Sequence, residues 1–386
     1  MWFLQVATLL LLLGLSLLWG IGARIAGKHA GKVFRVMPFV ELAILGYISK
    51  ELLVLHIGYI LFTWVLILLL RKCTKGRKFW FAFLCFACCM PVIYVRIAAF
   101  YSLPAAGLTL TGFIYSMLKA IDVLYYEYYS DQKANFEIYV NYMLFLPVLT
   151  AGPVFRYRDF QMSWLRPSPL DGDRLTTGTK RIIMGLFKKV VLATVVTEAL
   201  SYLMGLNLRW YHSLIIPLVS LAVLYFDMAG YADVAIGMGH IVGIKMPENF
   251  KKPFQAPSFN QFWRNWHATV SDWIREHVFI LFNNKKLNKW HGALISMVVM
   301  QLMSLWRGFS WMNVLDGLIL GLILAFEVIF GITTVNKRKA PKWYFQLRCA
   351  IVIYLFALDT MLFTLSTSEI KMVIKGLLTI FGGGLS

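Results

Sequence analysis

The sequence predicts an all-α protein that crosses a membrane several times. Of its 386 residues, 59% are apolar and 15% are charged, whereas soluble domains average about 45–50% apolar and about 25% charged residues. Apolar runs near the ~20 residues that a spanning helix needs recur along the whole chain. We therefore expect one membrane-embedded domain over residues 1–386, with about ten to twelve helices plus re-entrant or interfacial ones. A soluble enzyme, a secreted disulfide scaffold and a disordered tail are excluded.

The first helix and the basic residues after it predict the orientation. The run from Trp2 to Ala23 carries no charge, follows no basic region and lacks a cleavage site, so we expect a spanning helix rather than a signal peptide. Lys and Arg number 38 against 19 Asp and Glu, an excess that in an apolar protein indicates cytoplasmic loops rather than nucleic-acid binding. Two basic clusters should therefore be cytoplasmic and the amino terminus outside. The clusters are Arg24, Lys28, Lys32 and Arg35, then Arg71, Lys72, Lys75, Arg77 and Lys78.

The remaining apolar stretches predict the other spanning segments. Val36 to Ile48 and Leu52 to Leu70 should form a hairpin with one short leg. Further segments are expected at about 79–95, 100–121, 140–154, 181–204, 213–240, 292–306, 311–333, 345–365 and 371–381.

Two stretches interrupt this pattern. Residues 241–290 are polar and rich in Trp, with apolar islands too short to span, which indicates re-entrant or interfacial helices. In 151–160, Gly152-Pro153 should end a helix at the membrane interface. The five cysteines have no metal-ligand spacing, so we expect reduced packing residues and no metal site.

Three clusters place ionisable side chains near spanning segments, where they are costly and often functional. Asp227 and Asp233 lie within 225–233. Either one of them pairs with a basic loop residue and one lines a cavity, or both are structural hydrogen-bond anchors. Arg307 lies between two apolar runs and should snorkel to the interface or pair with Asp316.

The third cluster is the segment 259–275. At helical spacing its Trp and apolar residues form one stripe, formed by Trp263, Trp266, Val270, Trp273 and Ile274. An interfacial helix explains this stripe, but it does not require His267, whose type of side chain suits general-base catalysis near neutral pH. A structural and a catalytic His267 both remain open at this point.

Together these motifs resemble the membrane-bound O-acyltransferase family, in particular its bacterial branch that acylates cell-envelope polymers. The resemblance covers most of the chain from about Gly112 onward. It rests on the order of Leu146-Pro147, Ala151-Gly152-Pro153 with Arg156-Tyr157-Arg158, Tyr225-Phe226-Asp227-Met228-Ala229-Gly230-Tyr231-Ala232-Asp233, Pro247-Glu248-Asn249-Phe250, and Phe262-Trp263-Arg264-Asn265-Trp266-His267 with Ser271-Asp272-Trp273.

The resemblance implies a fold around a central tunnel, in the cytoplasmic (inner) membrane. An acyl thioester donor, acyl-CoA or an acyl carrier protein, would approach from the cytoplasm as a substrate, with no bound cofactor. A hydroxyl of an extracytoplasmic polymer would accept an acetyl-like group, and an extracytoplasmic acyl-accepting partner protein is also expected, together with membrane lipid. The residues expected to line the tunnel or bind substrate are Asp227, Trp263, Asn265, Asp272, Trp306 and Trp311.

The chain departs from the family at one catalytic position. Of the two signature histidines, one falls on His267 and the other on Arg307, within Leu305-Trp306-Arg307-Gly308. A guanidinium stays protonated and only donates hydrogen bonds, so Arg307 cannot be a base. Either His267 is the base and Arg307 stabilises the oxyanion, or the chain is a catalytically impaired relative that acts as a binding or scaffold subunit. A transporter unrelated to acyl transfer is the remaining alternative.

Overall fold

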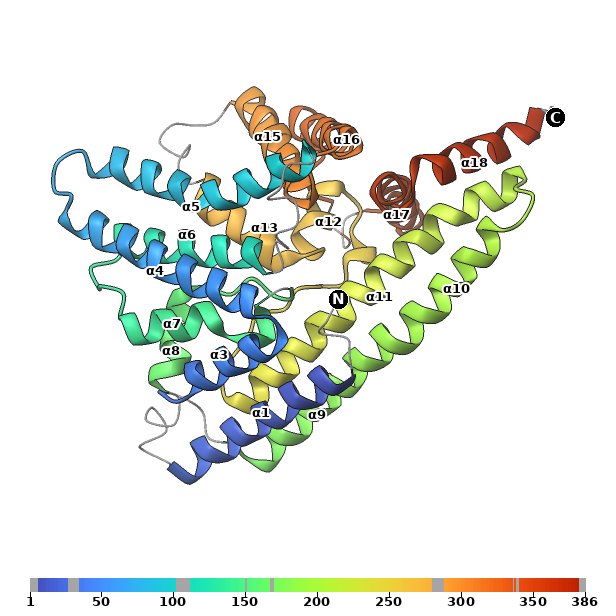
Figure 1. Ribbon diagram of the computed structural model, residues 1–386. Helices are drawn as coiled ribbons and strands as arrows, with labels where there is room; N and C mark the ends of the chain where they lie inside the picture. Colours follow the sequence, from blue (N-terminus) through green and yellow to red (C-terminus); the bar gives the residue numbers. More distant parts are fainter. Residues whose placement is uncertain are drawn as a thin grey trace. The chain divides into compact units, whose positions relative to one another are not determined.

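The computed structural model describes most of the chain, and every regular element in it is a helix (Figure 1). The described residues are 6–26, 35–101, 112–149, 151–166, 170–279, 288–335, 337 and 340–381. Within them, five helices are long and apolar enough to cross a membrane: α4 (Lys50–Lys72), α5 (Arg77–Phe100), α11 (Trp210–Val242), α16 (Trp311–Ile329) and α17 (Lys342–Thr364). The predicted all-α, polytopic fold class is thereby confirmed.

The chain forms two compact units. Unit 1 consists of Met1–Met184 and Ala232–Glu248, and unit 2 of Gly185–Tyr231 and Asn249–Ser386. Helix α11 contributes its first part to unit 2 and its last part to unit 1.

Unit 1 is built from helices of very different length. In addition to α4 and α5 it contains α1 (Val6–Ala26), α3 (Met37–Ile48), α6 (Phe113–Tyr129), α7 (Phe136–Leu144), the 3₁₀ turn η4 (Leu146–Val148), α8 (Tyr157–Leu165) and most of α9 (Gly172–Leu186). Helices α3, α4, α6 and α7 pack against one another. The rings of Tyr139, Tyr142 and Tyr157 are fully buried in this core, and the Asp122 carboxylate accepts a hydrogen bond of 2.6 Å from the Tyr157 backbone N–H.

The predicted helical hairpin with a short first leg is present as α3 and α4, which meet at Ser49. The expectation of one spanning segment at 140–154 is wrong, because α7 ends at Leu144 and only a 3₁₀ turn follows it. Pro147 has no N–H for a helical hydrogen bond, and Gly152, at φ 101°, is in the left-handed region. An apolar run therefore does not guarantee a continuous helix here.

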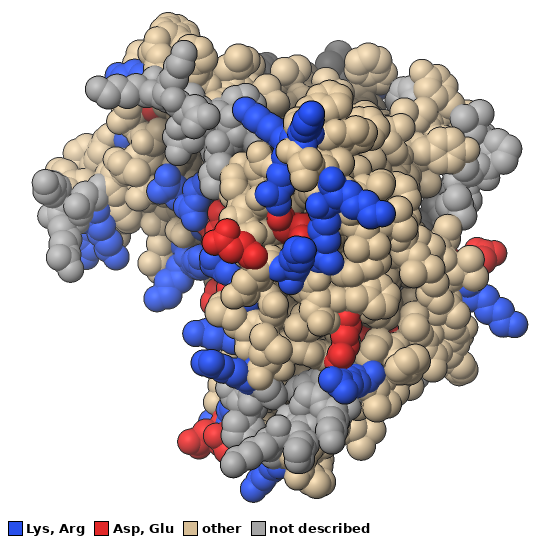
Figure 2. Space-filling model, turned by 90° about the vertical axis from the view of Figure 1, so that its left-hand side faces the viewer, with Lys and Arg blue, Asp and Glu red and all other residues tan. Residues whose placement is uncertain are grey.

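The second basic cluster lies at the turn between α4 and α5. Figure 2 views the molecule from the side on which this turn lies in Figure 1, and many Lys and Arg side chains gather there. Arg71 anchors the turn through a paired hydrogen bond to Glu127, at 2.8 and 2.9 Å. Lys72, Lys75 and Lys78 are exposed.

Unit 2 contains the remaining helices. They are the π-helical turn η5 (Phe187–Leu192), α10 (Ala193–Met204), the start of α11, η6 (Pro253–Gln255), α12 (Phe259–Asn265), α13 (Ala268–Ile274), the π turn η7 (Arg275–Phe279), α15 (Lys289–Arg307), α16, α17, α18 (Thr367–Leu378) and η8 (Thr379–Phe381). The predicted segment 181–204 is helical throughout, because α9, η5 and α10 follow one another without a gap, and the segment 371–381 is the short α18 with η8.

Helices α15 and α16 lie side by side (Figure 1). Glycines on α16 permit this close approach, because a Cβ at Gly317 would lie 2.9 Å from Gln301 Cα and one at Gly321 would lie 3.0 Å from Met297 Cα. Helices α12 and α13 have only seven residues each, far short of a bilayer. The expectation that this polar segment contributes non-spanning helices is therefore confirmed.

Candidate active site

His267 lies at a sharp break between α12 and α13. Its backbone is left-handed, with φ 47° and ψ 46°, and Trp266 before it is extended, with φ −90° and ψ 126°. The expectation of one continuous aromatic stripe on a single helix is therefore wrong. A non-glycine residue in the left-handed region is uncommon and costs free energy, so it persists only where its surroundings hold it.

The segment that begins at Asn249 holds His267 in place. The Ala268 N–H donates to the Asn249 carbonyl oxygen at 2.8 Å, and the Lys251 N–H donates to the Asn265 carbonyl oxygen at 2.8 Å. The Asn249 side chain reaches His267 itself, with 2.9 Å between Oδ1 and the ring Nδ1. The Thr269 hydroxyl donates to the same oxygen at 2.8 Å.

This geometry defines the state of the imidazole. An amide oxygen can only accept, so His267 Nδ1 carries the proton and Nε2 carries the lone pair. Burial lowers the pKa of His267 from 6.5 to about 4, since removing the ring from water disfavours the charged form. The side chain is half-buried. At neutral pH it is therefore an uncharged, oriented imidazole that can accept a proton at Nε2.

Aromatic rings and one carboxylate fix α12. The Trp266 ring stacks on Phe262, with centroids 5.5 Å apart, and contacts Phe356 of α17 at 5.0 Å. Glu327 of α16 accepts from the backbone N–H groups of Phe259 and Asn260, at 2.7 and 2.9 Å. These are orphan donors of the first helical turn, where a negative charge is favoured.

Arg307 ends α15 and forms the ion pair that the sequence suggested. Its Nη2 donates to Oδ2 of Asp316, the first acid on α16, and its Cζ lies 3.8 Å from the centroid of the Phe363 ring. The Arg307 side chain is 35% exposed, whereas Asp316 is fully buried. Within the described residues, no hydrogen bond joins Arg307 to His267, although both belong to unit 2.

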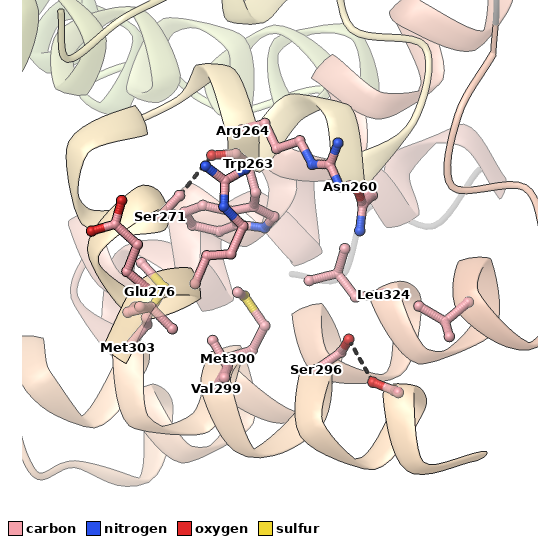
Figure 3. Close-up of a pocket in the computed structure, with 14 residues that line it drawn as sticks. Asn260, Trp263, Arg264, Ser271, Glu276, Ser296, Val299, Met300, Met303 and Leu324 are labelled. Carbon is pink, nitrogen blue, oxygen red and sulfur yellow. Dashed lines mark hydrogen bonds between the residues drawn. The ribbon is translucent and has the colours of Figure 1, made fainter. Parts of the chain in front are cut away.

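A pocket of about 550 Å³ lies among α12, α13, η7, α15 and α16, all in unit 2 (Figure 3). Its polar lining residues are Asn260, Arg264, Ser271, Arg275, Glu276 and Ser296, and its other lining residues are Trp263, Ile274, Gly292, Val299, Met300, Met303, Leu324 and Val328. Ser271 and Ser296 donate to backbone carbonyls, of Trp263 at 2.7 Å and Gly292 at 2.9 Å. Trp263 Nε1 and Asn260 Oδ1 are buried and have no hydrogen-bond partner in the described part of the chain.

The other predicted substrate residues are dispersed. Asp227 pairs with Lys189 of η5, and Asp272 pairs with Lys251 at 3.4 Å and Arg275 at 2.9 Å. Asn265 lines a different pocket, of about 570 Å³, together with Gln261 and Phe345.

The two tryptophans near Arg307 give less information. The Trp311 side chain is 81% exposed at the start of α16, and the Trp306 side chain lies outside the described part of the structure. Among the described residues, no group of three or more His, Cys, Asp or Glu side chains is arranged to hold a metal ion.

Sequence reasoning missed two residues of the site. Asn249, which orients His267, lies in the motif Pro247-Glu248-Asn249-Phe250, but no helical spacing connects it to the histidine. Asp359 of α17 is buried and interacts with Asp316 and Arg307. A charged residue inside an apolar run was the signal that could have identified it.

Comparisons with known proteins agree with these motifs. A probable alginate O-acetylase of Pseudomonas putida is 29% identical over 62% of this chain and 50% of its own length. A teichoic acid D-alanyltransferase of Streptococcus thermophilus is 27% identical over 78% of both chains. A peptidoglycan O-acetyltransferase of Helicobacter pylori is 29% identical over 50% of this chain and 37% of its own.

The match to the alginate O-acetylases covers about half of the length of those relatives. The family model described as the membrane-bound O-acyltransferase family matches residues 63–367, which include His267, Arg307 and both pockets. The chain therefore belongs to the membrane-bound O-acyltransferase family.

Proposed function

We propose that this protein is an O-acyltransferase of the cytoplasmic (inner) membrane. It transfers an acetyl-like group from a cytoplasmic thioester donor, acyl-CoA or an acyl carrier protein, to a hydroxyl of an extracytoplasmic polysaccharide or other envelope polymer. The observation that carries this proposal is the neutral His267, whose Nδ1 is bound by Asn249 and whose Nε2 has a lone pair. The activities named for the three relatives above support acyl transfer to a polymer as the reaction class.

The side chains suit each step of such a transfer. His267 Nε2 accepts the proton of the acceptor hydroxyl while the hydroxyl oxygen attacks the thioester carbonyl carbon. A tetrahedral oxyanion forms, and collapse breaks the carbon–sulfur bond. The thiolate that leaves takes the proton back from the imidazolium, which regenerates neutral His267.

Arg307 supplies a permanent positive charge for the oxyanion. Its contacts with Asp316 and Ser304 both use Nη2, and a guanidinium has further N–H donors on Nη1 and Nε. A well-placed donor of this kind lowers the barrier by about 2.7–4 kcal/mol. The pocket beside α12 and α13 has an apolar wall along α15 that suits the acyl part of the donor.

A second function is favoured by one observation. The arginine at the position of the expected family base is tied to a fully buried aspartate, so the chain has no base at this position. In that case the protein is a binding or scaffold subunit that retains the donor site without turnover.

Transfer from an acetyl thioester by the purified protein in lipid nanodiscs tests the proposal, with acetyl-CoA and an acetylated carrier protein as alternative donors. His267→Asn is the informative variant, because Asn tolerates the left-handed backbone and keeps a donor towards Asn249 but has no basic nitrogen. We expect turnover to fall ~10²–10⁴-fold, the usual loss for a general base. Arg307→Ala should reduce it ~10²–10³-fold.

His291→Ala is the matched control, because His291 is exposed at the start of α15. It should leave turnover unchanged. Turnover that survives both His267→Asn and Arg307→Ala would contradict the proposed site. Donor binding without any turnover by the native protein would instead support the scaffold function.

A further inference from the structure

Three charged side chains meet where α15, α16 and α17 of unit 2 come together. Arg307 of α15 pairs with Asp316 of α16. The Arg307 Cζ also lies 3.8 Å from the ring centroid of Phe363, one helical turn after Asp359 on α17, and α17 packs against α16. Asp359 is therefore within electrostatic reach of both charged groups. Asp316 is fully buried and Asp359 is 3% exposed. In the described part of the chain, no N–H or O–H group donates to either carboxyl oxygen of Asp359 or to Oδ1 of Asp316.

The charges of this cluster do not balance if both acids are ionised. One guanidinium offsets one carboxylate, and the second carboxylate leaves an excess negative charge among three helices of a membrane protein. Such a buried charge is costly unless it is compensated. Two ionised carboxylates are also acceptors only, so they cannot hydrogen-bond to each other without a proton between them.

We propose that Asp316 and Asp359 share one proton and together act as positioning residues for Arg307. The guanidinium then balances the single negative charge of the protonated acid pair. The Phe363 ring covers the guanidinium at 3.8 Å and the Ser304 hydroxyl lies 3.4 Å from Nη2. This assignment does not depend on the proposed reaction, since the same cluster would form in a scaffold subunit.

The cluster couples positions 307 and 316. Removing the guanidinium leaves buried Asp316 without its cation, and breaking one partner of a buried pair is strongly destabilising. A histidine at position 307, as the family resemblance would expect, is therefore incompatible with Asp316 unless Asp316 is neutralised as well.

Infrared difference spectroscopy on the full chain in nanodiscs tests the shared proton. The native protein minus Asp359→Asn should show the C=O stretch of a protonated carboxylic acid, shifted in D₂O. The native protein minus Asp316→Asn should show the same band, because either variant leaves one acid for one guanidinium. The control is Asp272→Asn, which removes an ion-paired acid elsewhere in unit 2. This variant should keep the shared proton, so the native protein minus Asp272→Asn should show no carboxylic-acid band. If the native protein minus Asp359→Asn shows the band of an ionised carboxylate and no carboxylic-acid band, both acids are ionised in the native protein and the proposal is overturned.

Thermal unfolding tests the coupling. Arg307→His should lower Tm, or prevent folding, and the double variant Arg307→His with Asp316→Asn should have a Tm closer to the native value than Arg307→His has. The decrease in Tm of the double variant is compared with the sum of the decreases caused by Arg307→His alone and Asp316→Asn alone. A decrease equal to that sum would contradict the positioning role of Asp316. Because Asn has the shape of Asp, the spectroscopic test remains available even where Arg307→His does not fold.

Discussion

At the scale of single residues, His267 combines two features that the sequence alone does not connect. Its left-handed backbone turns the chain between α12 and α13, and its ring is bound by Asn249, a residue 18 positions earlier. The type and position of His267 could be predicted from the motif, whereas the orienting Asn249 depends on the fold of the intervening loop. The consequence is a half-buried, oriented imidazole that stays neutral well below neutral pH.

This state predicts how stability depends on pH. The pKa of His267 is lowered from 6.5 to about 4 in the folded protein, so between these values the unfolded chain binds more protons. Stability then falls as the pH decreases from about 6.5 to about 4. His267→Asn removes this contribution. We therefore expect Tm to decline less between pH 6.5 and pH 4 in the variant than in the native protein. Scanning calorimetry of both proteins in nanodiscs measures the difference.

His291→Asn is a suitable control, because His291 is exposed at the start of α15. It should retain the native pH dependence. An identical decline in the native protein and in His267→Asn would contradict a neutral His267 in the folded protein.

At the scale of elements, short helices owe their position to long ones. Helix α12 is seven residues long, so it has little stability of its own. It is held at its first turn by Glu327 of α16 and along its length by aromatic contacts with Phe356 of α17. Helical periodicity predicted a stripe across 259–275 but could not show the break at His267, because the break follows from hydrogen bonds to Asn249.

Removing the carboxylate of Glu327 should therefore loosen α12. Glu327→Gln keeps the shape of the side chain but replaces one accepting oxygen by a donor that faces a backbone N–H. Hydrogen bonds to charged groups contribute about 1.5–3 kcal/mol, so we expect the free energy of unfolding to decrease by an amount of that order. Turnover should also become slower, because His267 lies two residues after the end of α12. Chemical denaturation in detergent measures the first effect.

Glu369→Gln is the matched control. Glu369 also accepts from a backbone N–H at a helix start, that of Ser366 in the capping box of α18, but this hydrogen bond is exposed. Its replacement should cost much less than that of Glu327. Equal losses for the two variants would show that the Glu327 carboxylate does not anchor α12.

At the scale of the whole molecule, composition was sufficient for the fold class but not for the division of the chain into helices. The apolar content predicted an all-α membrane protein, and α4, α5, α11, α16 and α17 confirm it. The apolar run at 140–154 is not one spanning helix, because α7 ends at Leu144, whereas 181–204 belongs to one uninterrupted helical run that includes the π turn η5. Hydropathy averages over such breaks, because they arise from Pro and Gly backbone limits and from local packing.

Orientation is the prediction that belongs to this scale. The exposed Lys75 lies in the turn between α4 and α5, within the basic cluster expected to face the cytoplasm. Helix α4 is long enough to span, so Lys50 at its other end should be outside. In a background with Cys73→Ser, we expect a Lys50→Cys variant to react with an impermeant thiol reagent in intact cells and a Lys75→Cys variant to react only after the membrane is permeabilised. Labelling of Lys75→Cys in intact cells would reverse the orientation, and with it the side from which the acyl donor is proposed to enter.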